Sequence, residues 1–311
     1  MIGDRDRRGL VLLLLPYLLG LALLIAIPAA ITFGLALFEF DLIRSPVFRG
    51  LGNFRELLGD DVFRISLRNS IVFAAAAVPL RLAGALALAL LLHHRFRGVG
   101  VYRTAGYLPT VVPDVAWALV WLWIFNPLYG PLNLALGAFG LPEPQWLTDP
   151  AAAQSAIVIM SLFQIGEGFL IAVATRQSLP PELYELASLE AAGPVYVFRR
   201  VTLPLMASTL LLLLFRDTVF SFQFNFVPAL LVTEGGPPPY STTYLPLFIY
   251  RNGFEYLRYG YAAAATLVMF LVTALIIFLQ WRLIVRRREA LALRRAGQSG
   301  RGPDPLSTVN Y

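Results

Sequence analysis

Five charged side chains lie inside long apolar stretches of this 311-residue chain. They are Arg81, Asp114, Glu167, Arg216 and Asp217. At about 1.5 Å of helical rise per residue, all five lie about 14–20 Å from the predicted cytoplasmic ends of their segments, near the middle of a bilayer. A charge at that depth marks either an ion pair that stabilises a helix bundle or a transport site. We expect Glu167 to pair with Arg216, and we expect Arg216 and Asp217, as neighbours on one helix, not to face each other.

A second polar set follows on the fifth apolar stretch, where Ser221, Gln223 and Asn225 alternate with phenylalanines, and Gln164 on the fourth stretch could join it. Amides form hydrogen bonds with hydroxyl groups and aromatic rings cover the apolar faces of sugar rings, so this mixture suits a polyol. The alternative is that the phenylalanines face lipid or pack in the core. The candidate substrate path consists of Gln164, Glu167, Arg216, Asp217, Phe222, Gln223 and Asn225.

The composition excludes several kinds of catalytic chemistry. All 25 basic residues are arginines, so there is no lysine for a P-loop or a Schiff base. There is no cysteine, and the two histidines, His93 and His94, are adjacent. Thiol chemistry, disulfides, zinc fingers and histidine-based triads are therefore excluded. We predict that the chain is not an enzyme and holds no metal.

The hydropathy of the chain indicates a polytopic membrane protein. Hydrophobic residues make up 58% and charged residues 14%, and the mean hydropathy is +0.67. Six apolar segments are each long enough to cross a hydrocarbon core of about 30 Å. They are Leu10–Phe38, Asn69–Leu92, Thr104–Phe125, Ala153–Thr175, Pro204–Leu231 and Tyr259–Trp281. We therefore predict an all-α membrane protein with six transmembrane helices.

The distribution of arginine sets the orientation of these segments. With the N-terminus inside, sixteen arginines fall on the cytoplasmic side and seven on the outer side. This excess predicts that both termini are cytoplasmic. The arginines lie next to the membrane ends, so anionic lipid explains the net charge of +6 and no nucleic acid partner is implied.

The cytoplasmic segment 181–204 is longer than a simple connection between two spans requires. Leu183, Leu186, Ala187 and Leu189 recur at roughly helical spacing, which predicts a short amphipathic helix that ends at Gly193–Pro194. Pro204 is expected to open the next apolar helix. We therefore predict that this segment is a loop that binds another protein.

The residues of this segment carry a family resemblance. It resembles the EAA loop of permease subunits of ABC importers, whose pattern is E-A-A, three residues, G, nine residues and I-x-L-P. Leu186 and Ala191 depart from the pattern, and Gly193 is expected to supply the bend that the family's glycine provides. We assign the coupling loop to Glu185, Leu186, Ala187, Leu189, Ala191, Gly193, Leu203 and Pro204, with Val201 in the position of the isoleucine.

A second resemblance narrows the family to its carbohydrate-uptake branch. The outer segment from Thr233 to Thr242 is similar to that branch's T-x-G-G-P…S/T-T signature. The runs Arg68-Asn69-Ser70 and Phe125-Asn126-Pro127…Gly130…Asn133 also resemble it. The resemblance covers roughly residues 10–285.

The resemblance implies a type I ABC importer permease fold and transport by alternating access. The implied partners are a second permease subunit, two ABC ATPase subunits and an extracytoplasmic solute-binding protein, all at the cytoplasmic membrane of a prokaryote. The chain itself would bind no cofactor, since ATP and Mg belong to the ATPase subunits. In the family, the residue matched by Glu185 helps to anchor the loop against the ATPase. The solute-binding protein would deliver substrate to outer loops such as 126–152 and 232–258.

We divide the chain into three parts. Residues 1–65 hold an N-terminal tail, the first transmembrane helix and an outer loop; residues 66–285 form the importer domain; and residues 286–311 form a polar tail expected to be disordered. The substrate is expected to be a sugar or related polyol, with glycerol-3-phosphate as the alternative if Arg81 or Arg216 is unpaired. An ion-coupled secondary transporter using Glu167 or Asp217 is the rival from another class, and it leaves the loop unexplained. A structural membrane protein is a further rival, which would need no charges at the midplane.

Overall fold

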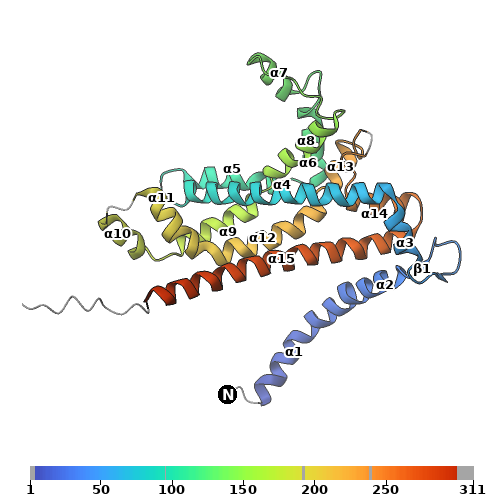
Figure 1. The fold of residues 1–311 in the computed structure, drawn as a ribbon, viewed down its shortest axis with the longest axis horizontal. Helices are drawn as coiled ribbons and strands as arrows, with labels where there is room; N and C mark the ends of the chain where they lie inside the picture. Colours follow the sequence, from blue (N-terminus) through green and yellow to red (C-terminus); the bar gives the residue numbers. More distant parts are fainter. Residues whose placement is uncertain (1–3, 95, 191–192, 238–239, 300–311) are drawn as a thin grey trace, which may run out of the picture.

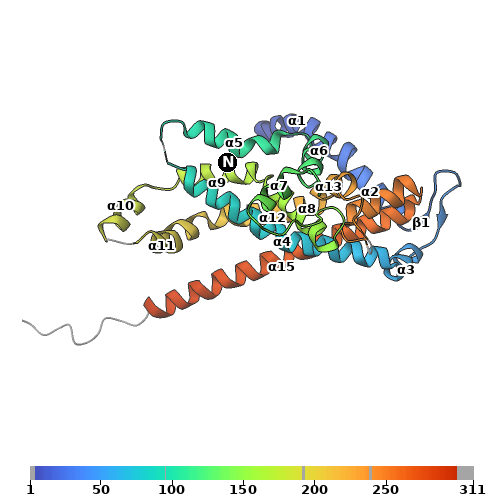
Figure 2. The same ribbon diagram turned by 90° about the horizontal axis from the view of Figure 1, so that it is seen from above.

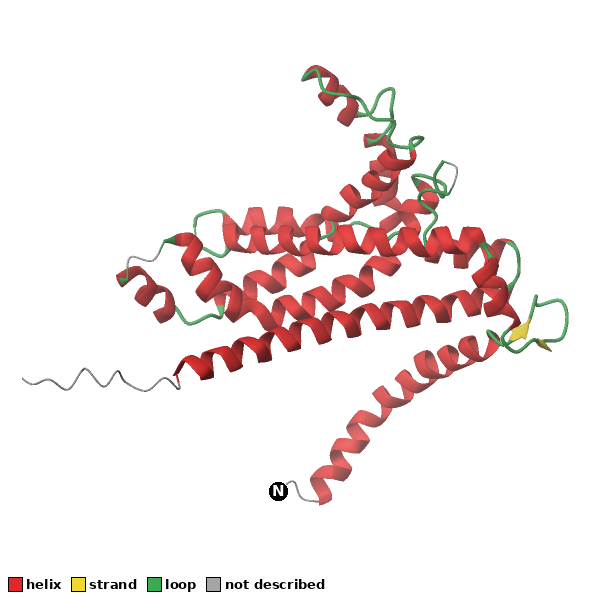
Figure 3. Ribbon diagram, viewed as in Figure 1, coloured by secondary structure: helices red, strands yellow, loops and turns green. Residues whose placement is uncertain are grey.

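The computed structural model describes residues 4–94, 96–190, 193–237 and 240–299. Ala191, which we assigned to the coupling loop, lies outside the described residues. The described chain is mostly helical and contains a single two-stranded sheet (Figure 3). Four of its helices are long and apolar enough to cross a membrane, and two bent helix pairs raise the number of candidate spans to as many as six.

The first apolar segment forms an arm beside the bundle. It consists of α1 (Asp4–Leu21), a π-helical turn (Ala22–Ala26) and α2 (Ile27–Leu35). α2 packs on α15, whereas α1 diverges from the other helices (Figure 1). Most of the apolar side chains on this arm are exposed.

A small outer cap follows the arm. β1 (Phe38–Glu39) pairs antiparallel with β2 (Val47–Phe48), and α3 (Gly52–Gly59) follows. The buried amide of Asn53 donates hydrogen bonds to the carbonyl oxygens of Ala36 (2.8 Å) and Phe38 (2.9 Å). This amide therefore fixes the end of the arm to α3.

The central helix of the bundle is α4 (Asp61–Leu92). The carboxylate of Asp60 caps its N-terminus by accepting hydrogen bonds from the backbone N–H groups of Val62 and Phe63. α4 packs against α8, α9, α12 and α14. Its buried face includes four alanines, which allow close helix approach: Ala74, Ala77, Ala85 and Ala89.

The third and fourth apolar segments are broken helices. α5 (Val99–Val111) and α6 (Asp114–Ile124) meet at an angle of 99°, so the predicted span over Thr104–Phe125 is a broken helix. The cause is Pro113, which lacks a backbone N–H and holds Val112 in an extended conformation. α7 (Pro131–Ala138) follows, and α8 (Pro150–Leu162) and α9 (Gly166–Gln177) then form a second pair bent by 43°.

The coupling segment forms α10 (Glu182–Leu189) and α11 (Pro194–Val197). α11 continues through a π-helical turn (Phe198–Thr202) into α12 (Leu203–Phe224) and α13 (Phe226–Leu231). The next apolar helix therefore begins at Pro194 and not at Pro204 as predicted. The wider π turn directly before Pro204 accommodates a proline ring within a continuous helix.

The last part of the chain contains two helices. α14 (Leu245–Tyr250) ends in a π-helical turn (Arg251–Glu255) within the predicted outer loop, and α15 (Tyr259–Ser299) runs back along the bundle. α15 extends well beyond the predicted end at Trp281. Residues 286–299, which we predicted to be disordered, are thus helical, and residues 300–311 lie outside the described part.

Candidate functional site

Four of the five predicted buried charges form one connected chain. Arg81 on α4 places its Nε 3.5 Å from the Oδ2 of Asp217 on α12. Arg216 places its Nη1 3.2 Å from the Oδ1 of Asp217, and its Nη2 pairs with the carboxylate of Glu167 on α9. The order is therefore Arg81, Asp217, Arg216 and Glu167, and the four formal charges cancel.

The predicted pair of Glu167 with Arg216 is present. The expectation that Arg216 and Asp217 would not face each other was wrong, because the guanidinium of Arg216 is long enough to curl back to its neighbour. Asp114 does not join the chain. It lies exposed in the first turn of α6, at the sharp bend, and forms no ion pair with a described residue.

Exposure increases steadily along this chain of charges. The side chain of Arg81 is 1% exposed and that of Asp217 is 11% exposed, whereas Arg216 and Glu167 reach 33% and 49%. Arg81 also donates hydrogen bonds to the Oγ of Ser221 (2.6 Å) and to the carbonyl oxygen of Asp217 (3.0 Å). The Arg81 end of this row of charges therefore joins α4 to α12, and the Glu167 end reaches the surface of the protein.

The second polar set is divided between buried and exposed positions. Gln223 is exposed, whereas Asn225 and Gln164 are buried. Neither amide atom of Asn225, nor Nε2 of Gln164, has a hydrogen-bond partner within the described part of the chain. Phe222 is 2% exposed and packs among core residues of α4, α14 and α15. Adjacent helical positions differ by about 100°, so Phe222 cannot share a face with Gln223.

The outer signature forms a compact loop with a structural role. Gly235 and Gly236 have positive φ angles of 89° and 82°, and a Cβ on Gly236 would lie 2.7 Å from the backbone nitrogen of Thr242. The hydroxyl groups of Thr233 and Thr242 lie 2.6 Å apart. The amide of Asn69 donates hydrogen bonds to two carbonyl oxygens of this loop, so two motifs distant in sequence meet here.

The Asn126–Asn133 motif is structural in the same way. The Oδ1 of Asn126 accepts from the backbone N–H groups of Leu128 (3.0 Å) and Tyr129 (3.2 Å). The Oδ1 of Asn133 accepts from the indole N–H of Trp146 at 2.7 Å. These contacts shape the loops on either side of α7.

The coupling helix α10 projects from the end of the bundle beside α11 (Figures 1 and 2). Its Ala187 is buried, whereas Leu186 and Leu189 are 58% and 81% exposed. Glu185 is exposed as well. The helix thus presents apolar and acidic side chains that no described residue covers.

Two contacts of Tyr184 attach α10 to the bundle. The guanidinium carbon of Arg176, in the last turn of α9, lies 3.9 Å from the centroid of the Tyr184 ring. The hydroxyl groups of Tyr184 and Thr202 are 3.2 Å apart. Gly193, predicted to supply the bend, has an ordinary φ of −65°, so its backbone does not require glycine. Leu203 and Pro204 lie in the first turn of α12 and not in the protruding part.

Two features of the structure were not predicted from the sequence. One is the pairing of Arg81 with Asp217. The other is the position of His93 and His94, which line a cavity beside α10. Their position between an apolar segment and a run of arginines was the available signal. The described residues contain no group of three or more His, Cys, Asp or Glu side chains that could hold a metal ion.

Comparisons with known proteins define the class. Residues 88–289 match the family model of the binding-protein-dependent transport system inner membrane component. The chain is 32% identical over 265 residues to the probable ABC transporter permease protein YesP of Bacillus subtilis, covering 84% of this chain and 85% of that protein. It is 31% identical over 246 residues to the sn-glycerol-3-phosphate transport system permease protein UgpA of Yersinia pestis, covering 78% and 82%.

A solved structure shares the fold. A chain of a bacterial ABC transporter involved in the import of the acidic polysaccharide alginate superposes with a TM-score of 0.77 at 23% identity. The match covers 91% of this chain and 96% of that one. A second crystal structure, of a bacterial alginate ABC transporter with an alginate pentasaccharide-bound periplasmic protein, gives a TM-score of 0.76 over 89% and 93% of the two chains.

These findings identify the kind of protein. It is a multi-pass component of the cytoplasmic membrane with the fold of a type I ABC permease. The chain belongs to the family of inner membrane components of binding-protein-dependent transport systems.

Proposed function

We propose that this chain is one of two permease subunits of an ATP-driven importer that moves a sugar or related polyol into the cell by alternating access. The observation that carries the proposal is the exposed coupling helix α10. Leu186 and Leu189 lie on it largely exposed, next to Glu185, and such a cluster needs a protein partner to cover it. An ion-coupled transporter has no use for such a helix.

In this mechanism two ABC ATPase subunits hold the coupling helices of the two permeases. They bind ATP and Mg, and this chain binds neither. Closure of the ATPases moves α10, and the movement passes into the bundle through the Arg176–Tyr184 stack and the Tyr184–Thr202 hydrogen bond. A solute-binding protein docks on the outer loops 126–152 and 232–258 and supplies the substrate.

We also propose that the chain crosses the membrane six times and that both termini are cytoplasmic. The direction of the helices supports it, since the far end of α15 lies at the same end of the bundle as α10 (Figure 1). Counting each bent pair as one span gives six crossings. An even number of crossings places both termini on one side of the membrane.

The pairing of the buried arginines favours a neutral substrate. An anionic substrate such as glycerol-3-phosphate would need an arginine available to bind it. Arg81 forms an ion pair with Asp217, although its Nε and Nη1 make no hydrogen bond with a described residue, and Arg216 is paired with both Asp217 and Glu167. The unpaired amides of Gln164 and Asn225 suit hydroxyl groups instead. The identity with UgpA keeps glycerol-3-phosphate as the second candidate.

The absence of cysteine makes a direct topology test possible. We expect Ser188→Cys on α10 to be protected from a membrane-impermeant maleimide in intact cells, and Tyr240→Cys in the outer loop to react. Both positions are exposed. Sugar uptake in the same cells should stop on ATP depletion and persist when an uncoupler dissipates the proton gradient while ATP is maintained. External labelling at Ser188→Cys, or uptake that survives ATP depletion, would contradict the proposal.

A further inference from the structure

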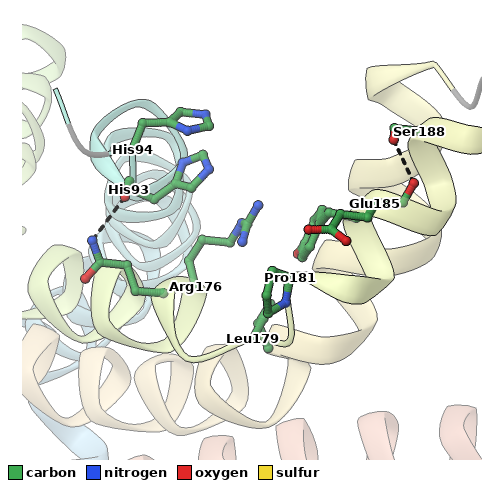
Figure 4. Close-up of a pocket in the computed structure, with 9 residues that line it drawn as sticks. His93, His94, Arg176, Leu179, Pro181, Glu185 and Ser188 are labelled. Carbon is green, nitrogen blue, oxygen red and sulfur yellow. Dashed lines mark hydrogen bonds between the residues drawn. The ribbon is translucent and has the colours of Figure 1, made fainter.

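A cavity of about 670 Å³ lies between the end of α4 and the coupling helix. His93 and His94 form one wall and Glu185 on α10 lies on the opposite wall, with Arg176 at the end of α9 between them (Figure 4). Figure 4 shows the two imidazoles and the guanidinium pointing toward the same space. The cavity lies just beyond Leu92, the last residue of a membrane span.

Arg176 is held in place but is not neutralised. Its guanidinium stacks on Tyr184, and it forms no ion pair with any carboxylate of the described residues. Its buried Nε has no hydrogen-bond partner in the same part of the chain. Burying a guanidinium nitrogen without a partner is costly. The guanidinium that points into the cavity (Figure 4) has no carboxylate partner among the described residues, so it suits an anionic ligand.

The two imidazoles extend this donor set. Their ring centroids are 3.7 Å apart. The Nδ1 of His93 lies 2.7 Å from the carbonyl oxygen of Leu90, which orients the ring, and the amide of Gln177 donates to the carbonyl oxygen of His93. Glu185 is the acidic group of the lining; it is exposed and forms no ion pair with a described residue.

We propose that this cavity is a binding site for a phosphate group, held by Arg176, His93 and His94. A guanidinium matches two phosphate oxygens in a bidentate geometry, and an imidazole that carries a proton on the nitrogen facing the cavity can donate to the third oxygen. His93 donates its Nδ1 proton to the carbonyl oxygen of Leu90, so it can donate to phosphate only as the imidazolium. The group could come from free phosphate or from the headgroup of an anionic lipid, since basic pockets at cytoplasmic helix ends bind lipid headgroups. Because the site joins α4 and α9 to α10, its occupancy would stiffen the attachment of the coupling helix. The site goes beyond the transport function and does not depend on it.

The test uses the full chain, with any subunits that co-purify, in nanodiscs of phosphatidylcholine. Binding of radiolabelled inorganic phosphate is measured for the wild type, Arg176→Gln and the double variant His93→Gln/His94→Gln. Arg282→Gln is the matched control, because Arg282 is exposed near the cytoplasmic end of α15 and does not line the cavity. A second set of nanodiscs contains phosphatidic acid, and the lipid that stays bound to the protein is counted by native mass spectrometry.

We expect Arg176→Gln to weaken phosphate binding by at least about tenfold, the cost of one charge-assisted contact, and Arg282→Gln to leave it unchanged. If the natural source is lipid, Arg176→Gln and the histidine variant lose retained phosphatidic acid instead. Phosphate and phosphatidic acid binding that are both unchanged in folded Arg176→Gln would overturn the proposal. Loss of the co-purifying ATPase with both kinds of binding unchanged would also overturn it, since the cavity would then be a docking site for a protein. If Arg176→Gln does not fold, the histidine variant decides in the same way.

Discussion

The two ends of α9 differ in whether their charged side chains form ion pairs. Glu167 in its first turn belongs to a chain of four charges that are all paired within the protein. Arg176 in its last turn stacks on an aromatic ring but has no ion-pair partner among the described residues. Both charges suit the helix dipole, so the dipole does not explain the difference.

The surroundings explain it. Hydrocarbon offers no partner, so a charge inside the bilayer must be satisfied by the chain itself. At the other end of α9, which we propose to be cytoplasmic, water and other molecules can solvate or bind an unpaired charge. The paired charges around Glu167 are therefore expected to stabilise the bundle, and the unpaired Arg176 is expected to bind a partner. Variants of the two groups should behave differently.

The largest expected effect is that of Arg81→Met. The change leaves Asp217 without its most buried partner and Ser221 without its donor. Breaking a buried pair in this way costs about 3–5 kcal/mol. We expect a sharply lower melting temperature and yield of the purified full chain.

The matched control for this variant is the double change Arg81→Met/Asp217→Asn. It removes the second charge as well and should recover part of the lost stability. A wild-type melting temperature for Arg81→Met would show that this end of the chain of charges does not stabilise the bundle.

Glu185→Gln should have the next largest effect, and on a different quantity. If Glu185 contacts the ATPase, losing one charge-assisted hydrogen bond costs about 1.5–3 kcal/mol of docking energy. We expect weaker co-purification of the ATPase and slower uptake at an unchanged melting temperature. Glu182→Gln is the control, since Glu182 is exposed on the first turn of the same helix. Equal losses from both variants would mean that only the net charge of α10 matters.

How far the sequence predicted these features depends on the range of the interactions. Apolar length and the helical spacing of apolar residues are local properties, so the candidate spans and the helix α10 were predictable. The continuation of α12 back to Pro194 was not, because it depends on a π turn that absorbs Pro204. Pro113 falls inside the predicted span Thr104–Phe125, but proline alone does not distinguish a tolerated kink from a 99° bend.

In the candidate site, too, local features were predictable and features that depend on helix packing were not. Depth along each segment identified the charged residues, and one pair, Glu167–Arg216, followed from complementarity. The ion pair between Arg81 and Asp217 depends on the rotation of α4 relative to α12, which cannot be read from one sequence. Phe222 packs in the core, which agrees with the alternative that the phenylalanines of this stretch pack rather than bind substrate.

A smaller effect is expected where the chain of charges reaches the surface. Glu167 and Arg216 are 49% and 33% exposed, and we expect their exposed side to face the proposed substrate path, where water would screen their attraction. A double-mutant cycle of Glu167→Gln and Arg216→Gln should give a coupling energy of about 0.2–1 kcal/mol in thermal stability. Uptake assayed on the same four proteins tests the substrate path. Strict additivity in both assays would show that the pair contributes nothing, whereas a large coupling would place Glu167 in a drier environment.

The smallest expected effect is a pH dependence at the other end of α9. Burial lowers the pKa of His93 below its usual value; the hydrogen bond to Leu90 opposes this shift, and the nearby positive charges add to it. The charged and titratable groups that face it are His94, Arg176 and Arg103, with Glu185 across the cavity. The folded chain therefore binds this proton less tightly than the unfolded chain does. The stabilisation is present above the usual histidine pKa and is lost as the pH falls below it.

Lowering the pH from about 7.5 to about 5.5 should thus destabilise the wild type more than His93→Gln. Melting temperatures of the two full-length proteins at both pH values measure the difference, and His94→Gln is the control for the exposed neighbour. Bound phosphate would raise the pKa of His93 by placing a negative charge beside it, so added phosphate should shrink the difference. An equal pH response in the wild type and His93→Gln would mean that water already solvates the imidazolium. The contrast between the two ends of α9 would then rest on Arg176 alone.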